Sequence, residues 1–434
     1  MKFLVTGLCF SQNLGGAAMA ISLVDQIKRR IPEAEFVFSV DGTSYAQEKK
    51  WADYYGMKIV HGDNCVFHFF NTNVLLRSAR IVHRVVRRRP LSFTGEVEHK
   101  KVHEEFMEAY RNSDAIISMR GISYVGDGTK GRLEGLLSYS DLHYAHKIGK
   151  PFTHFVQSFG PFDDWKVRYF ARKDFNHVEF IPARGKATAK YCREIIDHPE
   201  KVHDFPDIAI LLPMADNEWT RKYLEKIGFL GKEYVILSPS SVIHSFRPEV
   251  GGSTGKEHIR AFYLIARDLL CQGKHILFLP HAYSEDKRQC DREICRNIVE
   301  LLEDRGHSVS GWKIVEEDLD PWQAKALIAK SKLAVLSRYH AIVAAVSTCT
   351  PVIAIGWNIK YQDIMEYYGI ESMAIDARNK SPEEIAVFVS DKIKEYGQID
   401  SKALLSKRHE ENVERVVLAF ELLALWVKRH VEQI

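Results

Sequence analysis

Paired cysteines and clusters of metal ligands are missing from this 434-residue sequence. No two cysteines have the C-x-x-C spacing of a zinc or redox site, and no other group of residues has the spacing of metal ligands. The seven cysteines stand at positions 9, 65, 192, 271, 290, 295 and 349. Because disulfides are typical of oxidising compartments, their expected absence predicts a reduced intracellular protein. The absence of metal-ligand spacing predicts a metal-independent reaction.

Long apolar segments are missing as well. Met1 to Gly7 form a short apolar stretch without the basic start and long apolar core of a signal peptide. No later apolar run approaches the ~20 residues that are needed to cross a bilayer. The cytoplasm is therefore the expected compartment.

The sequence also lacks a large excess of either charge, since 60 basic residues stand against 57 acidic ones. This near balance argues against a general nucleic-acid binder. The exception is residues 73–89, where many cations alternate with Leu, Ile and Val and predict a basic amphipathic helix. Such a helix suits peripheral contact with the inner face of an anionic membrane, or with a phosphorylated or lipid-linked acceptor, but most such helices are simply solvated.

Buried strands and helices alternate through most of the chain, which predicts an α/β fold with parallel sheets. The chain is longer than one core usually supports, so two domains are expected. The pattern lapses near 213–232 and starts afresh at Tyr234. We therefore predict an N-terminal Rossmann-like domain at 1–220, a second at 221–400, and a long C-terminal helix at 401–434 that packs on them.

The most informative stretch is 332–360, which reads as a buried strand, a helix and a second buried strand. Ser337, Arg338 and His340 follow the first strand, where ligands of such units bind. A cation and an imidazole at a helix N-terminus suit an anionic substrate. In the alternative interpretation, Arg338 forms a salt bridge with a neighbouring loop and His340 merely caps the helix.

Strand ends in the first half also carry polar residues and glycines. Asn13, Gly15 and Gly16 precede a helix that we expect from Ala17 to about Arg30. The glycines permit close approach of the backbone to a ligand, but the G-x-G-x-x-G fingerprint of a dinucleotide site is incomplete.

Two further loops of the first half follow predicted strands. Arg120, Gly121 and Asp127 belong to a glycine-rich loop, in which Arg120 and Asp127 either contact substrate or form a structural ion pair. Gln157 and Ser158 precede a Gly-Pro turn.

The second half repeats this arrangement. Ser240 and the glycine-containing loop with Arg247 follow the strand that begins at Tyr234. His281 and Asp286 follow the strand that begins at His275. A lone histidine at such a position is more often structural than functional.

The order of these motifs resembles the polysaccharide pyruvyl transferase family over roughly residues 1–375. The matching segments are Asn13-Leu-Gly15-Gly16-Ala17, Asp114-Ala-Ile-Ile with its glycine-rich loop, Gln157-Ser-Phe-Gly160-Pro161, Leu279-Pro-His281 with Asp286, and Ser337-Arg338-Tyr-His340-Ala with Pro351-Val-Ile-Ala-Ile and Lys360. The resemblance implies a GT-B-like pair of Rossmann-type, doubly wound domains that face a cleft. It also implies transfer of pyruvate from phosphoenolpyruvate to sugar hydroxyls as a ketal, with the acceptor on the N-terminal domain, phosphoenolpyruvate on the C-terminal one, and no cofactor.

Roles follow from the chemistry of phosphoenolpyruvate, which carries a carboxylate and a phosphate. Arg338 is the first candidate to bind them and Arg247 the second. His340 is the candidate acid that protonates the methylene carbon, and we expect it to be protonated only with substrate bound. Asp127 or Asp286 accepts the hydroxyl proton. The substrate-binding set comprises Arg247, Ser240, His281, Asp286, Lys360, Asn13, Gly15, Gly16, Arg120, Gly121, Asp127 and Ser158.

Two departures from the family pattern limit this transfer of roles. Met119-Arg120-Gly121 stands where the family commonly has three glycines, so we expect a different acceptor. Ala183-Arg184-Gly185-Lys186 lacks the Arg-Glu dipeptide of the family, so Arg184 receives no role. The rival functions are a GT-B glycosyltransferase that uses a nucleotide sugar and a non-catalytic protein that binds an anionic sugar.

Overall fold

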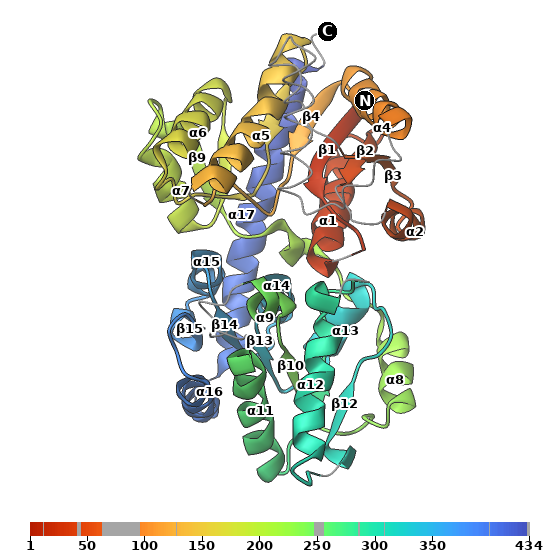
Figure 1. Cartoon of the computed structure of the whole chain (residues 1–434), viewed down its shortest axis with the longest axis vertical. Coiled ribbons are helices and arrows are strands. Elements are labelled where there is room, and N and C mark those ends of the chain that lie inside the picture. The colour runs from red at the N-terminus through yellow and green to blue at the C-terminus, as the bar shows by residue number, and fades with distance from the viewer. Residues whose placement is uncertain are drawn as a thin grey trace. The chain divides into compact units, whose positions relative to one another are not determined.

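The computed structural model describes residues 1–11, 13–40, 45–62, 96–126, 128–246, 256–284, 287–307, 309–398 and 400–431 (Figure 1). The basic helix expected at 73–89 lies outside these residues, as do Asp127, Arg247 and Asp286. Contacts divide the chain into two compact units. Unit 1 comprises Met1–Phe10, Leu23–Asp207 and Val416–Ile434, and unit 2 comprises Ser11–Ser22 and Ile208–Arg415. The sequence predicted the boundary between the two halves at residue 220, whereas the boundary between the contact units follows Asp207. In addition, the start of the first helix belongs to unit 2.

Unit 1 contains, within the described residues, a five-stranded parallel sheet in the order β3-β2-β1-β4-β6. The strands are β1 (Lys2–Leu8), β2 (Glu35–Val40), β3 (Lys58–His61), β4 (Ala115–Ser118) and β6 (Phe152–His154). Two short parallel pairs follow, formed by β5 (Ile122–Ser123) with β7 (Ser158–Phe159) and by β8 (Ile181–Arg184) with β9 (Val202–Phe205). Because strand order reverses beside β1, the carboxyl ends of β1 and β4 form the switch point of a doubly wound sheet.

The helices of unit 1 connect these strands. They are α1 (Leu14–Arg30, which starts in unit 2), α2 (Tyr45–Tyr54), α4 (Glu96–Arg111), α5 (Gly128–Lys147), α6 (Trp165–His177), α7 (Lys186–Arg193) and the 3-10 turn η2 (Pro199–Lys201). The long helix α17 (Ser401–His430) contributes its second half. There Phe420 packs on Phe155 with ring centroids 5.0 Å apart, and Arg30 binds Glu421 at 2.7 Å.

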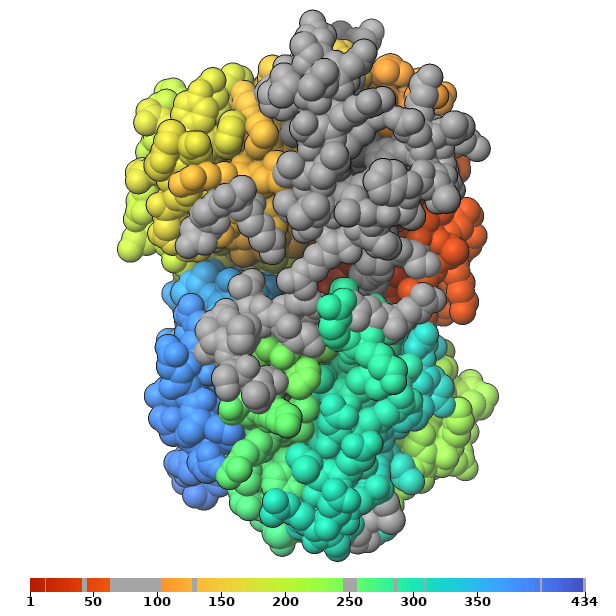
Figure 2. Space-filling model, viewed as in Figure 1, coloured from red at the N-terminus to blue at the C-terminus, as the bar shows by residue number. Residues whose placement is uncertain are grey.

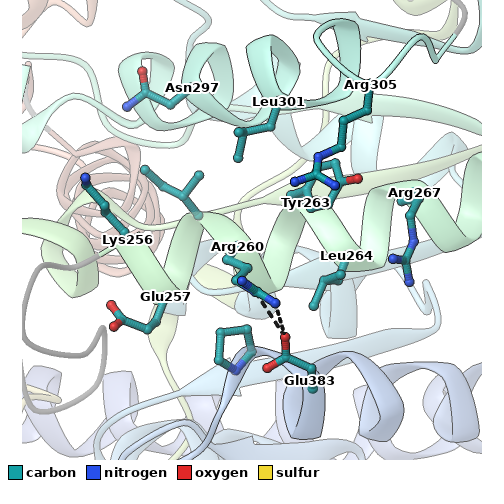
Figure 3. Close-up of a pocket in the computed structure, with 12 residues that line it drawn as sticks. Lys256, Glu257, Arg260, Tyr263, Leu264, Arg267, Asn297, Leu301, Arg305 and Glu383 are labelled. Atoms are coloured by element: carbon teal, nitrogen blue, oxygen red, sulfur yellow. Dashed lines mark hydrogen bonds and ion pairs between the residues drawn. The ribbon is translucent and has the colours of Figure 1, made fainter.

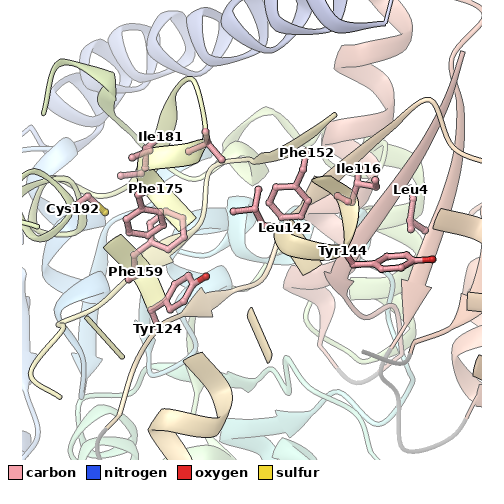
Figure 4. Close-up of a cluster of buried hydrophobic side chains, with 14 of the residues drawn as sticks. Leu4, Ile116, Tyr124, Leu142, Tyr144, Phe152, Phe159, Phe175, Ile181 and Cys192 are labelled. Carbon is pink, nitrogen blue, oxygen red and sulfur yellow. The ribbon is translucent and has the colours of Figure 1, made fainter. Parts of the chain in front are cut away.

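The core of unit 1 is rich in aromatic side chains (Figure 4). Phe152 comes from β6, Phe159 from β7 and Phe175 from α6, and all three are buried. The rings of Phe159 and Phe175 meet edge to face at 4.8 Å. This apolar contact anchors α6 against the strands whose ends carry the predicted loops.

A polar network lies inside this core. Asp174 of α6 accepts hydrogen bonds from the Tyr124 hydroxyl and from Nε2 of His154, the latter at 2.9 Å. Nδ1 of His154 accepts a hydrogen bond from the Gln157 amide at 2.6 Å. These hydrogen bonds join the segment after β5 to α6 and to the end of β6. All four side chains are buried, so the network has a structural role.

Unit 2 contains, within the described residues, a six-stranded parallel sheet in the order β12-β11-β10-β13-β14-β15. The strands are β10 (Tyr234–Ser238), β11 (His275–Phe278), β12 (Trp312–Ile314), β13 (Leu333–Leu336), β14 (Val352–Gly356) and β15 (Ala374–Asp376). This is again the doubly wound order, with the switch point between β10 and β13. Every residue of β10, β13 and β14 is buried, as the continuous apolar runs in the sequence predict.

Helices flank this sheet (Figure 1). They are α8 (Asn217–Lys226), α9 (Ser241–Phe246), α11 (Lys256–Cys271), α12 (Asp291–Glu303), α13 (Pro321–Lys330), α14 (Tyr339–Ser347), α15 (Ile359–Tyr367) and α16 (Pro382–Tyr396). The described residues of this unit also form four 3-10 turns: η3 (Ile208–Leu211), η4 (Lys287–Gln289), η5 (Val309–Gly311) and η6 (Glu371–Met373). No helix of the described residues is long and apolar enough to cross a membrane.

Helix α1 begins earlier than the sequence suggested. We expected it from Ala17, with the glycines in a preceding turn, but it starts at Leu14 and contains both glycines. The reason is the Asn13 side chain, whose Oδ1 accepts the Gly15 N–H at 3.0 Å and so replaces a missing helical partner.

Candidate functional site

The predicted site residues of unit 2 gather at the carboxyl ends of β10, β11, β13 and β14. Eight of them lie in this unit: Asn13, Gly15, Gly16, Ser240, His281, Arg338, His340 and Lys360. The first three come from the start of α1, whose Leu14 N–H donates to the His281 carbonyl at 3.4 Å. Residues that are far apart in the sequence therefore belong to one compact region.

Asp291 holds three of these strand ends together. Its fully buried carboxylate accepts the Ser241 N–H at 2.8 Å and the His281 N–H at 3.2 Å. It also accepts two hydrogen bonds from Arg338, through Nε at 2.8 Å and through Nη2. Because Asp291 is the first residue of α12, this helix is tied to the loops after β10, β11 and β13.

Arg338 is oriented by these contacts and keeps one edge open. Nη2 also donates to Ser241 Oγ at 2.8 Å, while Nη1 has no hydrogen-bond partner among the described residues. The side chain is 12% exposed. The sequence left open a salt bridge to a neighbouring loop or a substrate contact, and the structure contains the salt bridge together with an N–H edge that can still bind an oxyanion.

His340 lies in the first turn of α14 but does not cap it. The N-cap residue is Arg338, and no side chain caps the helix there. The imidazole instead packs against the backbone of Gly15 so closely that a Cβ at that position would overlap its Nδ1. The capping alternative for His340 therefore does not fit, and its role in catalysis stays a prediction.

Two neighbouring histidines are neutral. Burial, together with the nearby His340 and Arg338, lowers the pKa of His281 to about 3. Burial also lowers the pKa of His258 to about 3, and its Nε2 accepts the Ser240 N–H at 3.1 Å. Neither His281 nor His258 therefore adds a positive charge beside Arg338 near neutral pH.

Lys360 belongs to an aromatic cluster at the end of β14. Its ammonium lies 5.1 Å from the ring centroid of Tyr339 and 5.7 Å from those of Trp357 and Tyr361. The Tyr361 hydroxyl donates to the Ser337 carbonyl at 3.0 Å, which joins the ends of β13 and β14. A second cation is thus present in the first turn of α15, the helix that follows β14.

In unit 1, Arg120 occupies the place that Arg338 has in unit 2, two residues after the strand at the switch point. It binds Asp141 of α5 at 2.7 Å, and its stem lies where a Cβ on Gly7 would be. Gly7 has φ +89°, so it is suited to this crowded strand end. The structural ion pair that the sequence allowed for Arg120 is present, with Asp141 as its partner.

Arg184 explains the positions of Gly121 and Ser158. It is buried and binds Asp207 through Nη1 at 2.7 Å. It also donates to the Gly121 carbonyl through Nη2 and to Ser158 Oγ through Nε at 3.2 Å. Arg184, which received no role from the sequence, thus ties the loop after β4 and the short strand β7 to the end of β8.

A pocket of about 930 Å³ lies on another part of unit 2, between α11, α12 and α16 (Figure 3). Figure 2 shows these helices on the surface in green, teal and blue. In Figure 3, Arg260 points to Glu383, which it binds at 2.6 Å, and Arg305 lies over Tyr263. Of the predicted site residues that the structure describes, none lines this pocket.

Sequence reasoning missed Asp291 and Ser241, which hold Arg338 in place. An acidic residue at the start of a predicted helix is the signal that could have identified Asp291. Within the described parts of the chain, no group of three or more His, Cys, Asp or Glu side chains is arranged to hold a metal ion. The six cysteines of the described residues form no disulfide with one another.

Comparison with known structures defines the class of fold. The chain is similar to Anabaena Alr3699/HepE, solved in complex with UDP and glucose, with a TM-score of 0.56, 14% identity and coverage of 99% of this chain and 100% of that chain. It is also similar to S. aureus MnaA, solved with UDP, with a TM-score of 0.59, 12% identity and coverage of 100% and 98%. Together with the two Rossmann-like sheets, these matches confirm the predicted GT-B-like α/β fold.

Sequence comparison then gives the family. The model of the family described as polysaccharide pyruvyl transferase matches residues 13–359, so the chain belongs to this family and is a transferase. The Erwinia amylovora amylovoran biosynthesis protein AmsJ is 20% identical over 309 residues, which are 71% of this chain and 72% of AmsJ. Both findings support a pyruvyl-transfer role in polysaccharide synthesis and confirm the predicted family.

Proposed function

We propose that this protein transfers pyruvate from phosphoenolpyruvate to hydroxyl groups of a sugar in a polysaccharide or glycan precursor, forming a ketal. One observation carries the proposal: Arg338 and His340 open the same helix at a switch point, in a chain of this family. The proposed reaction needs no metal and no cofactor, and we place it in the cytoplasm.

The donor is a dianion or trianion, and the region around Arg338 suits it. The open Nη1 edge can donate to one carboxylate or phosphate oxygen, and the N–H groups at the start of α14 can donate to another. Lys360, in the first turn of α15, supplies a second positive charge. Asp291 fixes the direction of the guanidinium before the donor arrives, which lowers the entropic cost of binding.

His340 is the proposed acid. Its imidazolium gives a proton to the methylene carbon of phosphoenolpyruvate, which becomes a methyl group, and the adjacent carbon becomes electrophilic. One sugar hydroxyl attacks that carbon and gives its proton to the proposed base, Asp127 or Asp286. A second hydroxyl then displaces the phosphate and closes the ketal, and its proton goes to the phosphate group, which leaves as inorganic phosphate.

We place the sugar acceptor with the strand-end loops of unit 1. Gly121 and Ser158 are held there by Arg184, and Arg120 keeps its charge balanced by Asp141. Because that charge is balanced, we expect a neutral sugar and not an anionic one at Arg120. Contact of residues 73–89 with a membrane or a lipid-linked acceptor remains part of the proposal.

The experiment incubates the full chain with phosphoenolpyruvate and a panel of glycans. It measures inorganic phosphate and the mass of the glycan, and we expect release of phosphate together with addition of a pyruvyl ketal. The His340→Gln variant should lose about 10²–10⁴-fold in turnover while it still binds phosphoenolpyruvate. Consumption of a UDP-sugar without phosphate release from phosphoenolpyruvate would favour a glycosyltransferase, and binding of an anionic sugar without turnover would favour a binding protein.

A further inference from the structure

Lys325 of α13 is a buried cation without an acidic partner among the described residues. Its side chain is 4% exposed, and its ammonium donates to the carbonyls of Leu212 at 2.5 Å and Ile210 at 3.3 Å. Removing an ammonium from water is costly when only neutral groups compensate it. Burial accordingly lowers the pKa of Lys325 to about 7. Such a costly group needs a reason beyond packing, since an apolar side chain would fill the same space.

The reason is a small cavity that Lys325 shares with two histidines. The cavity has a volume of about 20 Å³, which is room for one water molecule. Lys325, His281 and His340 line it, with apolar side chains that include Leu14 and Val343. Nδ1 of His281 is buried and has no hydrogen-bond partner among the described residues, so it can bind that water.

The other ionisable groups around the cavity are neutral or already paired. His409 of α17 also faces Lys325, and burial and this cation lower its pKa to about 4. His281 is neutral, as its pKa of about 3 indicates. Beyond His281, Arg338 is bound to Asp291, and no acidic side chain of the described part of the chain lines the cavity. Lys325 is therefore the lining residue that can exchange a proton with His340 near neutral pH.

We propose that Lys325 is a positioning residue that supplies the proton of His340 through one water molecule held in this cavity by His281. The Lys325 ammonium gives a proton to the water, and the water gives one of its own to the imidazole, which leaves a neutral amine and an imidazolium. After the imidazolium has protonated the donor, the amine regains a proton from solvent. This inference rests on the proposed role of His340 as the acid.

The test follows the titration of His340 by NMR in the full chain, with isotope-labelled histidine and without substrate. The His340→Gln variant assigns the signal. In the unmodified protein the His340 signal should show a second inflection near pH 7, which belongs to Lys325. In Lys325→Met this inflection should disappear, and the midpoint of His340 should rise by about one pH unit because a nearby positive charge is lost.

The matched control is Lys330→Met, which removes an exposed lysine of the same helix and should leave the His340 titration unchanged. An unchanged titration in a folded Lys325→Met variant would overturn the proposal. If that variant does not fold, the titration of the Lys325 side chain in the unmodified protein decides. A Lys325 midpoint near pH 7 that coincides with the second inflection of the His340 signal supports the relay, and a Lys325 midpoint near pH 10 overturns it.

These measurements separate two failures, because they need no reaction. If the chain releases no phosphate from phosphoenolpyruvate, the proposed function fails while the coupling between Lys325 and His340 is still measured. If phosphate is released, the relay predicts that Lys325→Met lowers kcat about tenfold or more at pH 7 and leaves KM for phosphoenolpyruvate nearly unchanged. Equal losses in kcat for Lys325→Met and Lys330→Met would contradict the relay.

Discussion

The imidazole of His340 rests on the backbone of Gly15, and a Cβ at position 15 would overlap Nδ1 of that ring. Gly15 belongs to the first turn of α1, which Asn13 caps, and His340 belongs to the first turn of α14. The first turns of two helices that are far apart in the sequence thus fix the position of the His340 side chain. The absence of a side chain at position 15 is what permits this contact.

We predict that Gly15→Ala displaces His340 and lowers phosphate release from phosphoenolpyruvate by about 10²-fold, because small misplacements of a reacting group are costly. Helix α1 should remain intact, since alanine favours a helix more than glycine does. Steady-state phosphate assays with an accepted glycan and circular dichroism measure the two effects.

The control for this prediction is Gly135→Ala in α5. A Cβ there would meet no atom nearer than 3.6 Å, so activity should be unchanged and stability equal or slightly higher. Full turnover by a folded Gly15→Ala variant would show that the position of His340 does not depend on the glycine.

A second prediction concerns Asp291, which compensates the guanidinium of Arg338. Asp291→Ala should lower the free energy of unfolding by about 3–5 kcal/mol, because it leaves Arg338 buried without its partner. The double variant Asp291→Leu/Arg338→Met should regain much of this loss and should not bind phosphoenolpyruvate. Urea unfolding and calorimetry with phosphoenolpyruvate measure both effects. Tight binding of phosphoenolpyruvate by the double variant would show that Arg338 does not bind the donor.

The sequence predicted the parts of this site that depend on local pattern. Arg338 and His340 follow an apolar strand and precede a helix of small residues, so their place at a strand end could be predicted from periodicity. The alternation of strands and helices similarly predicted both doubly wound sheets. These features need only neighbours along the chain.

Contacts between distant segments could not be predicted in this way. Asp291 follows β11 and Arg338 follows β13, and both strands lie beside β10 in the sheet. This order brings the two side chains into contact, and no local pattern reveals it. Lys325 stands among apolar residues of α13, but a lysine is normally placed at the surface, so its burial was not expected. The partner of Arg120 was equally hidden, since Asp141 lies inside α5.

A third prediction concerns the buried pair of Arg184 and Asp207 in unit 1. Arg184→Met should lower the free energy of unfolding by about 3–5 kcal/mol, because it breaks a buried ion pair by removing the guanidinium that Asp207 binds. The matched control is Arg172→Met, whose ion pair with Asp197 is more than half exposed and should contribute less than about 1 kcal/mol. Denaturant unfolding of both variants measures the difference, and equal losses would contradict a structural role for Arg184.

The last prediction uses the pKa of Lys325, which burial lowers to about 7 from about 10.4 in an unfolded chain. Between these values the unfolded chain binds more protons than the folded one, so this lysine makes the protein more stable as the pH rises from 7 to 10. Lys325→Met abolishes this dependence. Urea unfolding across that range should therefore show the wild type gaining a few kcal/mol relative to Lys325→Met, up to about 4 kcal/mol. Relative to Lys330→Met, whose lysine is exposed, the wild type should gain almost nothing. Parallel stability curves for the wild type and Lys325→Met would mean that Lys325 keeps its ordinary pKa, and the water-linked relay to His340 would then lose its proton source.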